Sequence, residues 1–184
     1  MNDSISRLLE AAEGGDPTAH DRLFTLLYDE LRRCAHRQLG GSAQTMSTTA
    51  LVNETYLKLV SAQTLKLGSR QHFMALAARA MRQVMVDQAR AIGASKRGGG
   101  QLQVTLDEHI PDTPAEALEV LALDQALGEL EKIDERAARV VQLHFFGGLT
   151  FGAIGELEGI NERTAKRDWE AARRLLAMAM SSAL

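Results

Sequence analysis

The feature that most restricts the fold of this chain is a run of helix-capping and turn residues near its C-terminus. Thr150 can cap one helix, Gly159 can supply a turn, and Asn161 can cap a second helix with basic outer positions. This order of signals predicts a helix-turn-helix unit over residues 150–174. Free N–H groups and a positive dipole at the start of the second helix favour a phosphate backbone, so DNA recognition is the leading hypothesis.

The second helix of this unit has a predicted apolar side and a predicted charged side. The apolar side repeats at intervals of four, three and four residues, and consists of Ala165, Trp169, Ala172 and Leu176. The charged side consists of Arg163, Lys166, Arg167, Glu170 and Arg173. Arg can donate two hydrogen bonds to a guanine edge, and Lys can reach phosphate or a base acceptor, so these positions predict DNA contact. An amphipathic surface helix stabilised by salt bridges is the alternative interpretation.

The composition of the whole chain favours helices over sheet. Hydrophobic residues make up 45% of the 184 residues and aromatic residues only 4%. No apolar run is long enough to cross a bilayer, and the N-terminus lacks a basic flank followed by an apolar core, so we expect a cytoplasmic protein without a membrane span. The single cysteine, Cys34, cannot form an internal disulfide, and we expect it to pack in a helix.

The net charge of −3 hides two basic segments separated by an acidic one. Residues 79–97 hold five basic residues against one acid, a net +4, and residues 161–174 hold five against three, a net +2. Residues 106–136 hold ten acids against two bases, a net −8. Two basic segments predict two contacts with nucleic acid, with the acidic stretch kept off the DNA, although solvated helix faces would give the same pattern.

Three helices are predicted in the first half of the chain. After a short N-terminal turn, Asp16 and Pro17 can start a helix that runs to about residue 38. A second helix is expected over residues 49–60, and Ser69 can cap a third that runs to about residue 93. The first of these has a predicted buried stripe of Leu23, Leu26, Leu27, Leu31 and Ala35.

The predicted third helix is basic on one face. Its apolar face consists of Phe73, Leu76, Ala77, Ala80, Val84 and Gln88. Helical spacing then gathers Arg79, Arg82, Gln83, Val86 and Arg90 on another face.

A linker separates these helices from the second half of the chain. Residues 95–113 break every helical period and contain consecutive glycines. Thr113 and Glu116 can form a capping box, which opens helices expected at about 114–131, 134–146, 150–158 and 161–181. We therefore predict an all-α chain with one helical domain over residues 1–94, a flexible linker over 95–113, and a four-helix domain over 114–184.

The sequence offers no convergent set of reactive groups. It has no phosphate-binding glycine loop, no His-Glu-x-x-His, no paired cysteine and no Gly-x-Ser-x-Gly. The histidines are scattered over separate elements at positions 20, 36, 72, 109 and 144, and we expect each to be a surface or capping residue. We therefore expect neither catalysis nor a metal or cofactor.

The two halves together resemble the extracytoplasmic-function (ECF) sigma factors of bacterial RNA polymerase over nearly the whole chain. Residues 51–57, Leu-Val-Asn-Glu-Thr-Tyr-Leu, are similar to the family's region-two core, Leu-Val-Gln-Glu-x-Phe-Leu. Residues 73–90 resemble the helix that melts and reads the minus-ten element, and residues 149–173 resemble the region-four reader of the minus-thirty-five element. The resemblance implies an alternative sigma factor that directs core polymerase to promoter DNA and initiates transcription.

The resemblance also implies site residues and partners. The three- to four-helix N-terminal domain would bind the polymerase β′ clamp helices through Asn53, Glu54 and Tyr56, and the C-terminal domain would dock on the β flap. The implied minus-ten residues are Arg79, Arg82, Gln83, Val86 and Arg90. The implied minus-thirty-five residues are Arg163, Thr164, Lys166, Arg167, Glu170 and Arg173. Phe73 is the only aromatic residue of the melting helix and is expected in the core, so weak melting and a narrow promoter range follow.

One segment departs from the family pattern. The family places an acidic cluster of the type Asp-Ala-Glu-Asp before this core to bind basic residues of the clamp, whereas residues 47–50 here are Ser-Thr-Thr-Ala. Thr49 or Thr48 is an adequate helix cap, which explains the residues structurally. The departure also resembles a subgroup thought to be controlled by a Ser/Thr kinase, so phosphorylation of Thr49 first, or Thr48 second, is the sharper hypothesis.

Other interpretations stay open at this stage. The chain could be a stand-alone helix-turn-helix regulator that binds operator DNA without polymerase, or a protein-interaction module. Constitutive weak polymerase binding or an anti-sigma factor could replace kinase control. The sequence does not decide whether the two domains fold onto each other and hide their DNA-reading surfaces.

Overall fold

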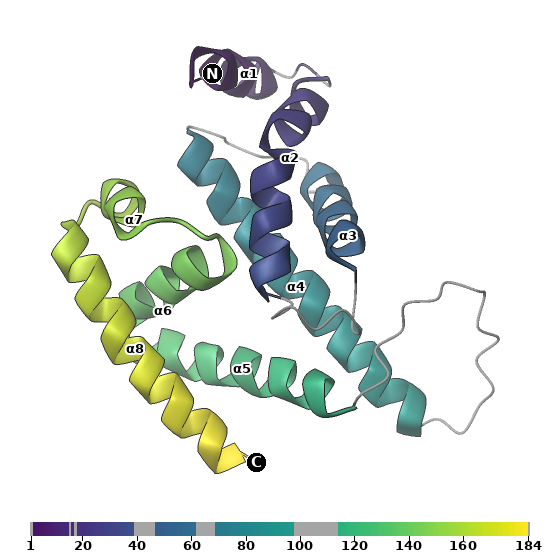
Figure 1. Cartoon of the computed structure of the whole chain (residues 1–184), viewed down its shortest axis with the longest axis vertical. Coiled ribbons are helices and arrows are strands. Elements are labelled where there is room, and N and C mark those ends of the chain that lie inside the picture. Colours follow the sequence, from purple (N-terminus) through teal and green to yellow (C-terminus); the bar gives the residue numbers. More distant parts are fainter. Residues whose placement is uncertain are drawn as a thin grey trace.

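A computed structural model describes residues 2–14, 16, 18–38, 47–61, 69–97 and 114–183, and all regular structure within these ranges is helical. The all-α prediction is therefore confirmed for the described residues. In chain order, the helices are α1 (Asn2–Glu13), α2 (Ala19–Gln38), α3 (Thr48–Ser61), α4 (Arg70–Arg97), α5 (Pro114–Ile133), α6 (Glu135–Val141), α7 (Phe151–Glu158) and α8 (Glu162–Ala183). A π-helical turn, Gln142–Phe146, continues α6 (Figure 1).

Helix α1 occupies the segment for which the sequence predicted only a short turn. Ile5, Leu9 and Ala12 are buried, at the spacing of one helical face, and α1 packs against α2. A helix of this length is marginal on its own, so its stability comes from this tertiary contact. The prediction was wrong because so short an apolar stripe forms a stable helix only against a partner helix, which the local sequence does not reveal.

Helices α2, α3 and α4 form the core of the first half. Leu23, Leu27 and Leu31 are at most 1% exposed, and Leu51 and Val52 of α3 are fully buried beside them. Leu26 is 47% exposed, so its predicted place in the buried stripe is wrong. It lies about 100° round the helix from Leu27, outside the stripe that faces the neighbouring helices.

The structure confirms one prediction about α4 and corrects another. Ser69 caps the helix as predicted, because its Oγ accepts a hydrogen bond from the backbone N–H of His72 at 3.1 Å. At the other end α4 runs to Arg97, through positions assigned to the linker from the sequence. The rest of that linker and the side chains of the Thr113–Glu116 capping box lie outside the described residues.

The second half packs α8 against α5, α6 and α7. Leu127 and Leu130 of α5, Ala137 of α6, and Ala172 and Leu176 of α8 are buried in one apolar cluster. These helices begin and end within a few residues of their predicted bounds.

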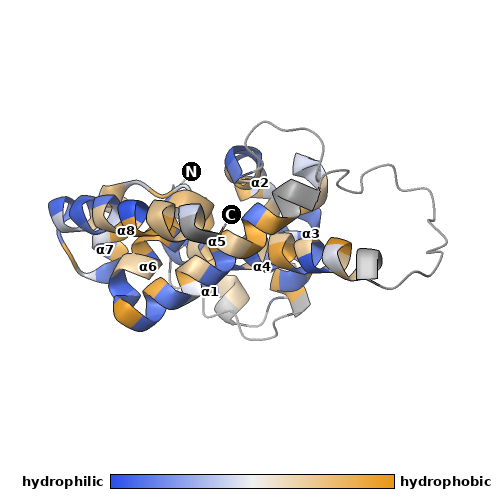
Figure 2. Cartoon of the chain, turned by 90° about the horizontal axis from the view of Figure 1, so that it is seen from below, coloured by the Kyte–Doolittle hydropathy of each residue, from blue (hydrophilic) through white to orange (hydrophobic). Residues whose placement is uncertain are grey.

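The two halves pack against each other along α4, and Figure 1 shows α5 beside α4, closest to it at the N-terminal end of α5. Ala78 of α4 belongs to the apolar cluster of the second half, while Leu143 and Ile154 join the core of the first half. Figure 2 shows hydrophobic residues of α4 and α5 at the centre of the molecule and hydrophilic residues on much of the outer side of α8. The described residues therefore form one closed arrangement.

Polar contacts at the C-terminal end of α2 also join the halves. The Cys34 thiol donates a hydrogen bond to the carbonyl oxygen of Gly147 at 3.1 Å, and Gln38 Nε2 donates one to the carbonyl oxygen of Phe146 at 2.6 Å. Cys34 is 4% exposed, which confirms its predicted packing role. Burial raises the pKa of this thiol and keeps it protonated.

Candidate nucleic-acid interface

The predicted caps and turn of the helix-turn-helix are all present. Thr150 Oγ1 accepts a hydrogen bond from Ala153 N at 3.2 Å, and Asn161 Oδ1 accepts one from Thr164 N at 2.8 Å. Gly159 ends α7 with φ 66° and ψ 32°, a left-handed conformation that glycine adopts without strain. These local interactions fix the direction in which α8 leaves the turn.

A second glycine in this unit was not recognised from the sequence. A Cβ atom on Gly155 would lie 2.6 Å from the carbonyl oxygen of Ile160, which is closer than real Cβ atoms approach. The Ile160 N–H donates a hydrogen bond to the Gly155 carbonyl oxygen at 3.0 Å across the same contact. Gly155 therefore lets α7 approach the turn closely. Its position four residues before Gly159 was the available signal.

The apolar and charged sides of α8 are divided as predicted. Ala165 is fully buried, Ala172 is 1% exposed, and Trp169 is half-buried between the two apolar clusters. The side chains predicted to face outward are exposed: Arg163, Lys166, Arg167, Glu170 and Arg173. Thr164, also assigned to DNA reading, is half-buried.

The charged groups on the outer side of α8 are largely uncommitted. Within the described residues, Arg163, Lys166 and Arg173 form no ion pair. Arg167 is 73% exposed and approaches only Asp168, at 3.8 Å. Exposed, unpaired cations on a capped helix can take up phosphate or base contacts without first breaking internal bonds.

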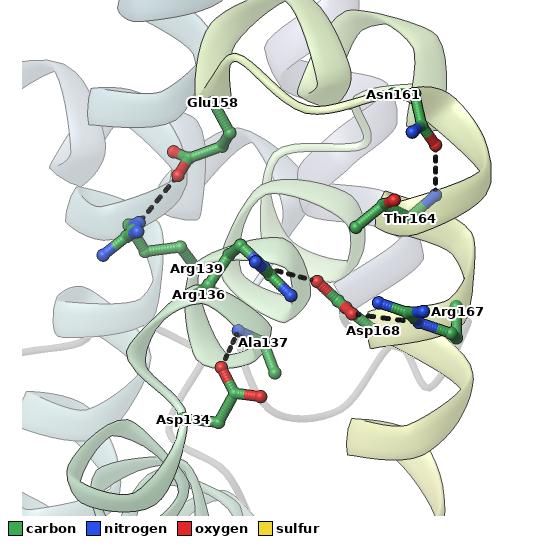
Figure 3. A network of polar contacts seen from close by, with 9 residues as sticks. All are labelled: Asp134, Arg136, Ala137, Arg139, Glu158, Asn161, Thr164, Arg167 and Asp168. Atoms are coloured by element: carbon green, nitrogen blue, oxygen red, sulfur yellow. Dashed lines mark hydrogen bonds and ion pairs between the residues drawn. The ribbon is translucent and has the colours of Figure 1, made fainter.

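An ion pair between α6 and α8 orients this surface (Figure 3). Asp168 is 7% exposed, and its Oδ2 accepts a hydrogen bond from Arg136 Nε at 2.7 Å. That bond raises the pKa of the Arg136 guanidinium above its ordinary value. The sequence placed Asp168 in the charge total of a basic segment. The structure turns it inward, where it ties α8 to α6.

Further polar contacts hold α6 and α7 in place (Figure 3). Asp134 caps α6 by accepting from Ala137 N at 2.9 Å. Arg139 Nε donates to Glu158 Oε2 at 2.8 Å, and the Arg139 guanidinium also pairs with Glu135 at 2.7 Å. The support beneath α8 is thus a network of short-range ionic contacts.

His144 is part of this support and is half-buried. Its ring stacks on Phe151 at a centroid distance of 4.3 Å and meets the edge of Trp169 at 4.7 Å. Its Nδ1 lies 2.8 Å from the carbonyl oxygen of Leu149. The prediction that each histidine is a surface or capping residue is therefore wrong for His144, because the aromatic neighbours come together only in the folded chain.

The side chains predicted to form one basic face on α4 have different surroundings in the structure. Arg79, Gln83 and Arg90 are exposed, whereas Val86 is 3% exposed and Arg82 is turned toward the second half. Arg82 Nε and Nη2 contact Asp124 Oδ1 of α5 at 2.9 and 2.7 Å, and Arg82 Nη1 donates to Gln142 Oε1 at 3.2 Å.

Asp124 approaches a second arginine as well, since Arg90 Nη2 lies 3.8 Å from its Oδ2. The acidic segment predicted to stay off DNA therefore contacts the basic face of α4. A cavity of about 520 Å³ beside this contact is lined by cations and carboxylates of both halves, including Arg79, Arg139, Glu131 and Glu158. Phe73 is 2% exposed and lies in the core, as predicted.

The residues assigned to polymerase contact lie on or beside the outer face of α3. Asn53 and Glu54 are exposed. Tyr56 is half-buried, because its ring packs on Phe24 at a centroid distance of 4.4 Å and its hydroxyl donates to Asp21. This hydrogen bond raises the pKa of the Tyr56 phenol.

Sequence reasoning missed an apolar stripe on the same face of α3. Leu57 is 58% exposed and Val60 is 49% exposed, four and seven residues after Asn53. That spacing places all three on one helical face. The signal lay in the sequence, but an exposed leucine cannot be told from a buried one without the neighbouring helices.

The N-terminus of α3 is capped by Ser47. Its Oγ accepts a hydrogen bond from Ala50 N at 3.1 Å, and its carbonyl oxygen accepts one from Leu51 N at 3.0 Å. The prediction that Thr49 or Thr48 is the cap is therefore wrong, because α3 begins one residue earlier than expected. Thr49 is exposed in the first turn, and Thr48 is half-buried.

The described residues contain no group of three or more His, Cys, Asp or Glu side chains placed to hold a metal ion. None of their helices combines the length and apolar character needed to span a membrane.

Comparison with models of known protein families gives a match over nearly the whole chain. A model of the family described as ECF sigma factor matches residues 2–182. No curated protein matches the chain.

Proposed function

Because the chain belongs to the ECF sigma factor family, and so directs core RNA polymerase to promoter DNA, we propose that α8 reads the minus-thirty-five element and α4 handles the opened minus-ten element. The exposed, unpaired cations at the start of the capped helix α8 carry this proposal. A helix-turn-helix inserts this end of its second helix into the major groove. Arg163, Lys166 and Arg167 would lie nearest the DNA, with Thr164, Glu170 and Arg173 beside them.

On α4 the proposed minus-ten residues are Arg79, Arg82, Gln83, Val86 and Arg90. Opened strands are held by cationic walls and pockets for unstacked bases. In the closed arrangement Arg82 is paired with Asp124 and Val86 is buried. Handling of the opened strand therefore requires α5 to move away from α4, and binding to core polymerase would supply the free energy for that movement.

For polymerase binding we assign the outer face of α3, and propose that it docks on the β′ clamp helices. Asn53 and Glu54 offer exposed polar groups, and Leu57 and Val60 offer exposed apolar area beside them. An apolar centre with a polar rim is the usual composition of a protein interface. Tyr56 would support this face through its contact with Phe24. The C-terminal half would dock on the β flap.

Phosphorylation by a Ser/Thr kinase is the regulation we propose. The first turn of α3 carries no acidic side chain, although it lies beside the docking face. Thr49 is exposed there, and a phosphate on it would add about −1.5 to −2 charge at a helix N-terminus, where negative charge is favourable. An anti-sigma factor that covers the same face is a further partner we propose.

Transcription in vitro with added core polymerase tests the promoter-reading proposal. Arg167→Ala and Lys166→Ala should each reduce initiation at a cognate promoter by about 5- to 150-fold, since a good base contact contributes ~1–3 kcal/mol. Lys132→Ala is the matched control. Lys132 is 70% exposed on α5, so its replacement removes the same charge from a position outside α8. Equal initiation by all three variants would refute the role of α8.

Retention of core polymerase tests the phosphorylation proposal separately. Wild type, Thr49→Ala and Thr49→Glu proteins are compared before and after treatment with the kinase. We expect stronger binding by the phosphorylated wild type and by Thr49→Glu than by Thr49→Ala. Equal retention in every case would contradict control at this residue.

A further inference from the structure

A groove lies between the C-terminal part of α2 and the start of α3. It has a volume of about 490 Å³. The residues that line it are Asp29, Arg32, Arg33, His36, Arg37 and Thr48. The lining of the groove thus includes three arginines and a histidine, together with one carboxylate and a single hydroxyl group.

Helical spacing on α2 produces this concentration of cations. The five lining residues of α2 recur three, four, seven and eight positions after Asp29, which is one face of a helix. Leu27, Leu31 and Cys34 are buried on the opposite side and fix the orientation of α2. This orientation places the cationic face on the exposed side of α2, where it lines the groove together with Thr48 at the start of α3.

The cations of the groove are poorly neutralised by the protein itself. Arg32, Arg33 and Arg37 form no ion pair within the described part of the chain. Arg37 Nη2 donates a hydrogen bond to the Cys34 sulfur at 3.4 Å and packs against Gly148, where it leaves no room for an added Cβ atom. Like charges at positions i and i+4 of a helix repel each other, as between Arg33 and Arg37. The negative end of the α2 dipole explains cations in its last turn. The dipole does not explain why these cations line a groove together with a hydroxyl group of another helix.

The three hydroxyl residues at the start of α3 have different surroundings. Ser47 Oγ is engaged as the helix cap. Thr49 is exposed and does not line the groove. Thr48 is half-buried and is the one residue of α3 that lines it, among the described residues.

We propose that this groove is a phosphate site, and that the phosphate it fits is the phosphoryl group of a phosphothreonine at position 48. Guanidinium groups bind phosphate oxygens through paired N–H donors, and the unpaired N–H groups of the first turn of α3 favour the same charge. The proposal rests on the proposed control by phosphorylation. It deepens that control by assigning a second acceptor whose charge is bound within the molecule.

The modification itself requires a nucleoside triphosphate. Thr48 Oγ1 attacks the γ-phosphorus and forms a new O–P bond, while the bond from that phosphorus to the β,γ-bridging oxygen breaks. The hydroxyl proton passes to a base of the kinase, and the nucleoside diphosphate leaves. A phosphate on Thr48 would then join α3 to the arginines of α2, whereas a phosphate on Thr49 would face outward to a partner.

The proposal can be tested without the kinase, by incorporating phosphothreonine at position 48 of the full chain during translation. Phosphothreonine at position 49 is the matched control, because it lies in the same helical turn. The second pKa of each phosphate is measured by ³¹P NMR. Nearby cations favour the dianion, so we expect the pKa at position 48 to be lower by roughly half a unit or more. Equal pKa values would overturn the proposal.

Variants identify the groups responsible. Arg32→Gln and Arg33→Gln should each raise the phosphate pKa at position 48 toward that at position 49. Arg22→Gln removes a charge from an exposed position of the same helix outside the groove, and should leave the pKa unchanged. An effect of Arg22→Gln equal to the others, or unfolding of the protein with phosphothreonine at 48, would overturn the proposal.

A titration of the unmodified protein with inorganic phosphate separates the two sources of phosphate. Saturable shifts of the α2 arginine signals in the Thr48→Val variant would assign the groove to a free phosphate ligand, and would overturn the assignment to phosphothreonine. Weak, unsaturated shifts together with a lowered pKa at position 48 support it. Failure at position 48 leaves control through Thr49 intact, because polymerase retention tests that control independently.

Discussion

Asp124 holds α5 against the basic face of α4, and its replacement by asparagine should open this contact. The Asp124→Asn side chain has the same shape and keeps one acceptor oxygen, but it loses the negative charge opposite Arg82 and Arg90. The wild-type carboxylate accepts from Arg82 Nε at 2.9 Å and lies 2.7 Å from Arg82 Nη2. The change therefore tests the ionic contact without creating a cavity.

The expected magnitude follows from the exposure of the pair. The Arg82 and Asp124 side chains are 23% and 25% exposed, between a surface pair and a buried one. Surface pairs contribute up to about 1 kcal/mol, and breaking a buried pair costs about 3–5 kcal/mol. We therefore expect the closed arrangement to lose about 1–2 kcal/mol, which shifts its equilibrium with open forms by about 5- to 30-fold.

Two assays measure this shift in the equilibrium between closed and open forms. Chemical denaturation should show the loss in unfolding free energy, and affinity for single-stranded minus-ten DNA should rise by up to the same factor as the shift in equilibrium. Glu119→Gln is the control, because Glu119 is exposed on the same helix. A variant that loses the expected stability but binds this DNA no better would refute the idea that α5 masks α4.

Three further predictions concern single residues. Gly155→Ala should destabilise the protein by about 1–3 kcal/mol through overpacking, whereas Gly152→Ala, whose added Cβ meets nothing closer than 3.7 Å, should be neutral or stabilising in thermal denaturation. Arg136→Ala should cost more unfolding free energy than Asp168→Ala, because it leaves a carboxylate that is 7% exposed without its partner; equal losses would contradict this. Cys34 has a raised pKa, so its thiol should alkylate more slowly than a free thiol at pH 8, and unfolding free energy should fall as the pH rises past the ordinary value of 9.0. Alkylation at the same rate in native buffer and in denaturant would refute the burial of Cys34.

Much of the helix-turn-helix could be predicted because its signals are local. The caps at Thr150 and Asn161 and the turn at Gly159 involve hydrogen bonds or backbone angles within three or four residues. Such interactions are fully specified by neighbouring side chains. The exposed side of α8 could be predicted from the same helical period, because Trp169 marks the buried side.

Local signals were less decisive where several residues compete for one role. Three consecutive hydroxyl residues, Ser47 to Thr49, can each cap a helix, and the sequence does not rank them. The choice of Ser47 follows from where Leu51 and Val52 must lie to be fully buried. That requirement depends on α2 and α4, which are distant in the chain.

The sequence by itself determined every described helix except α1, most of their ends, the capped turn before α8 and the resemblance to a family that the comparison confirms. Only the tertiary structure decided which charged groups are available. Arg82 lies on a basic helical face, but Asp124, forty-two residues away, pairs with it. Asp168 lies in a basic segment, but Arg136 holds it inside. Helical periodicity gives the direction of a side chain relative to its own helix axis, whereas its partner depends on how the helices pack.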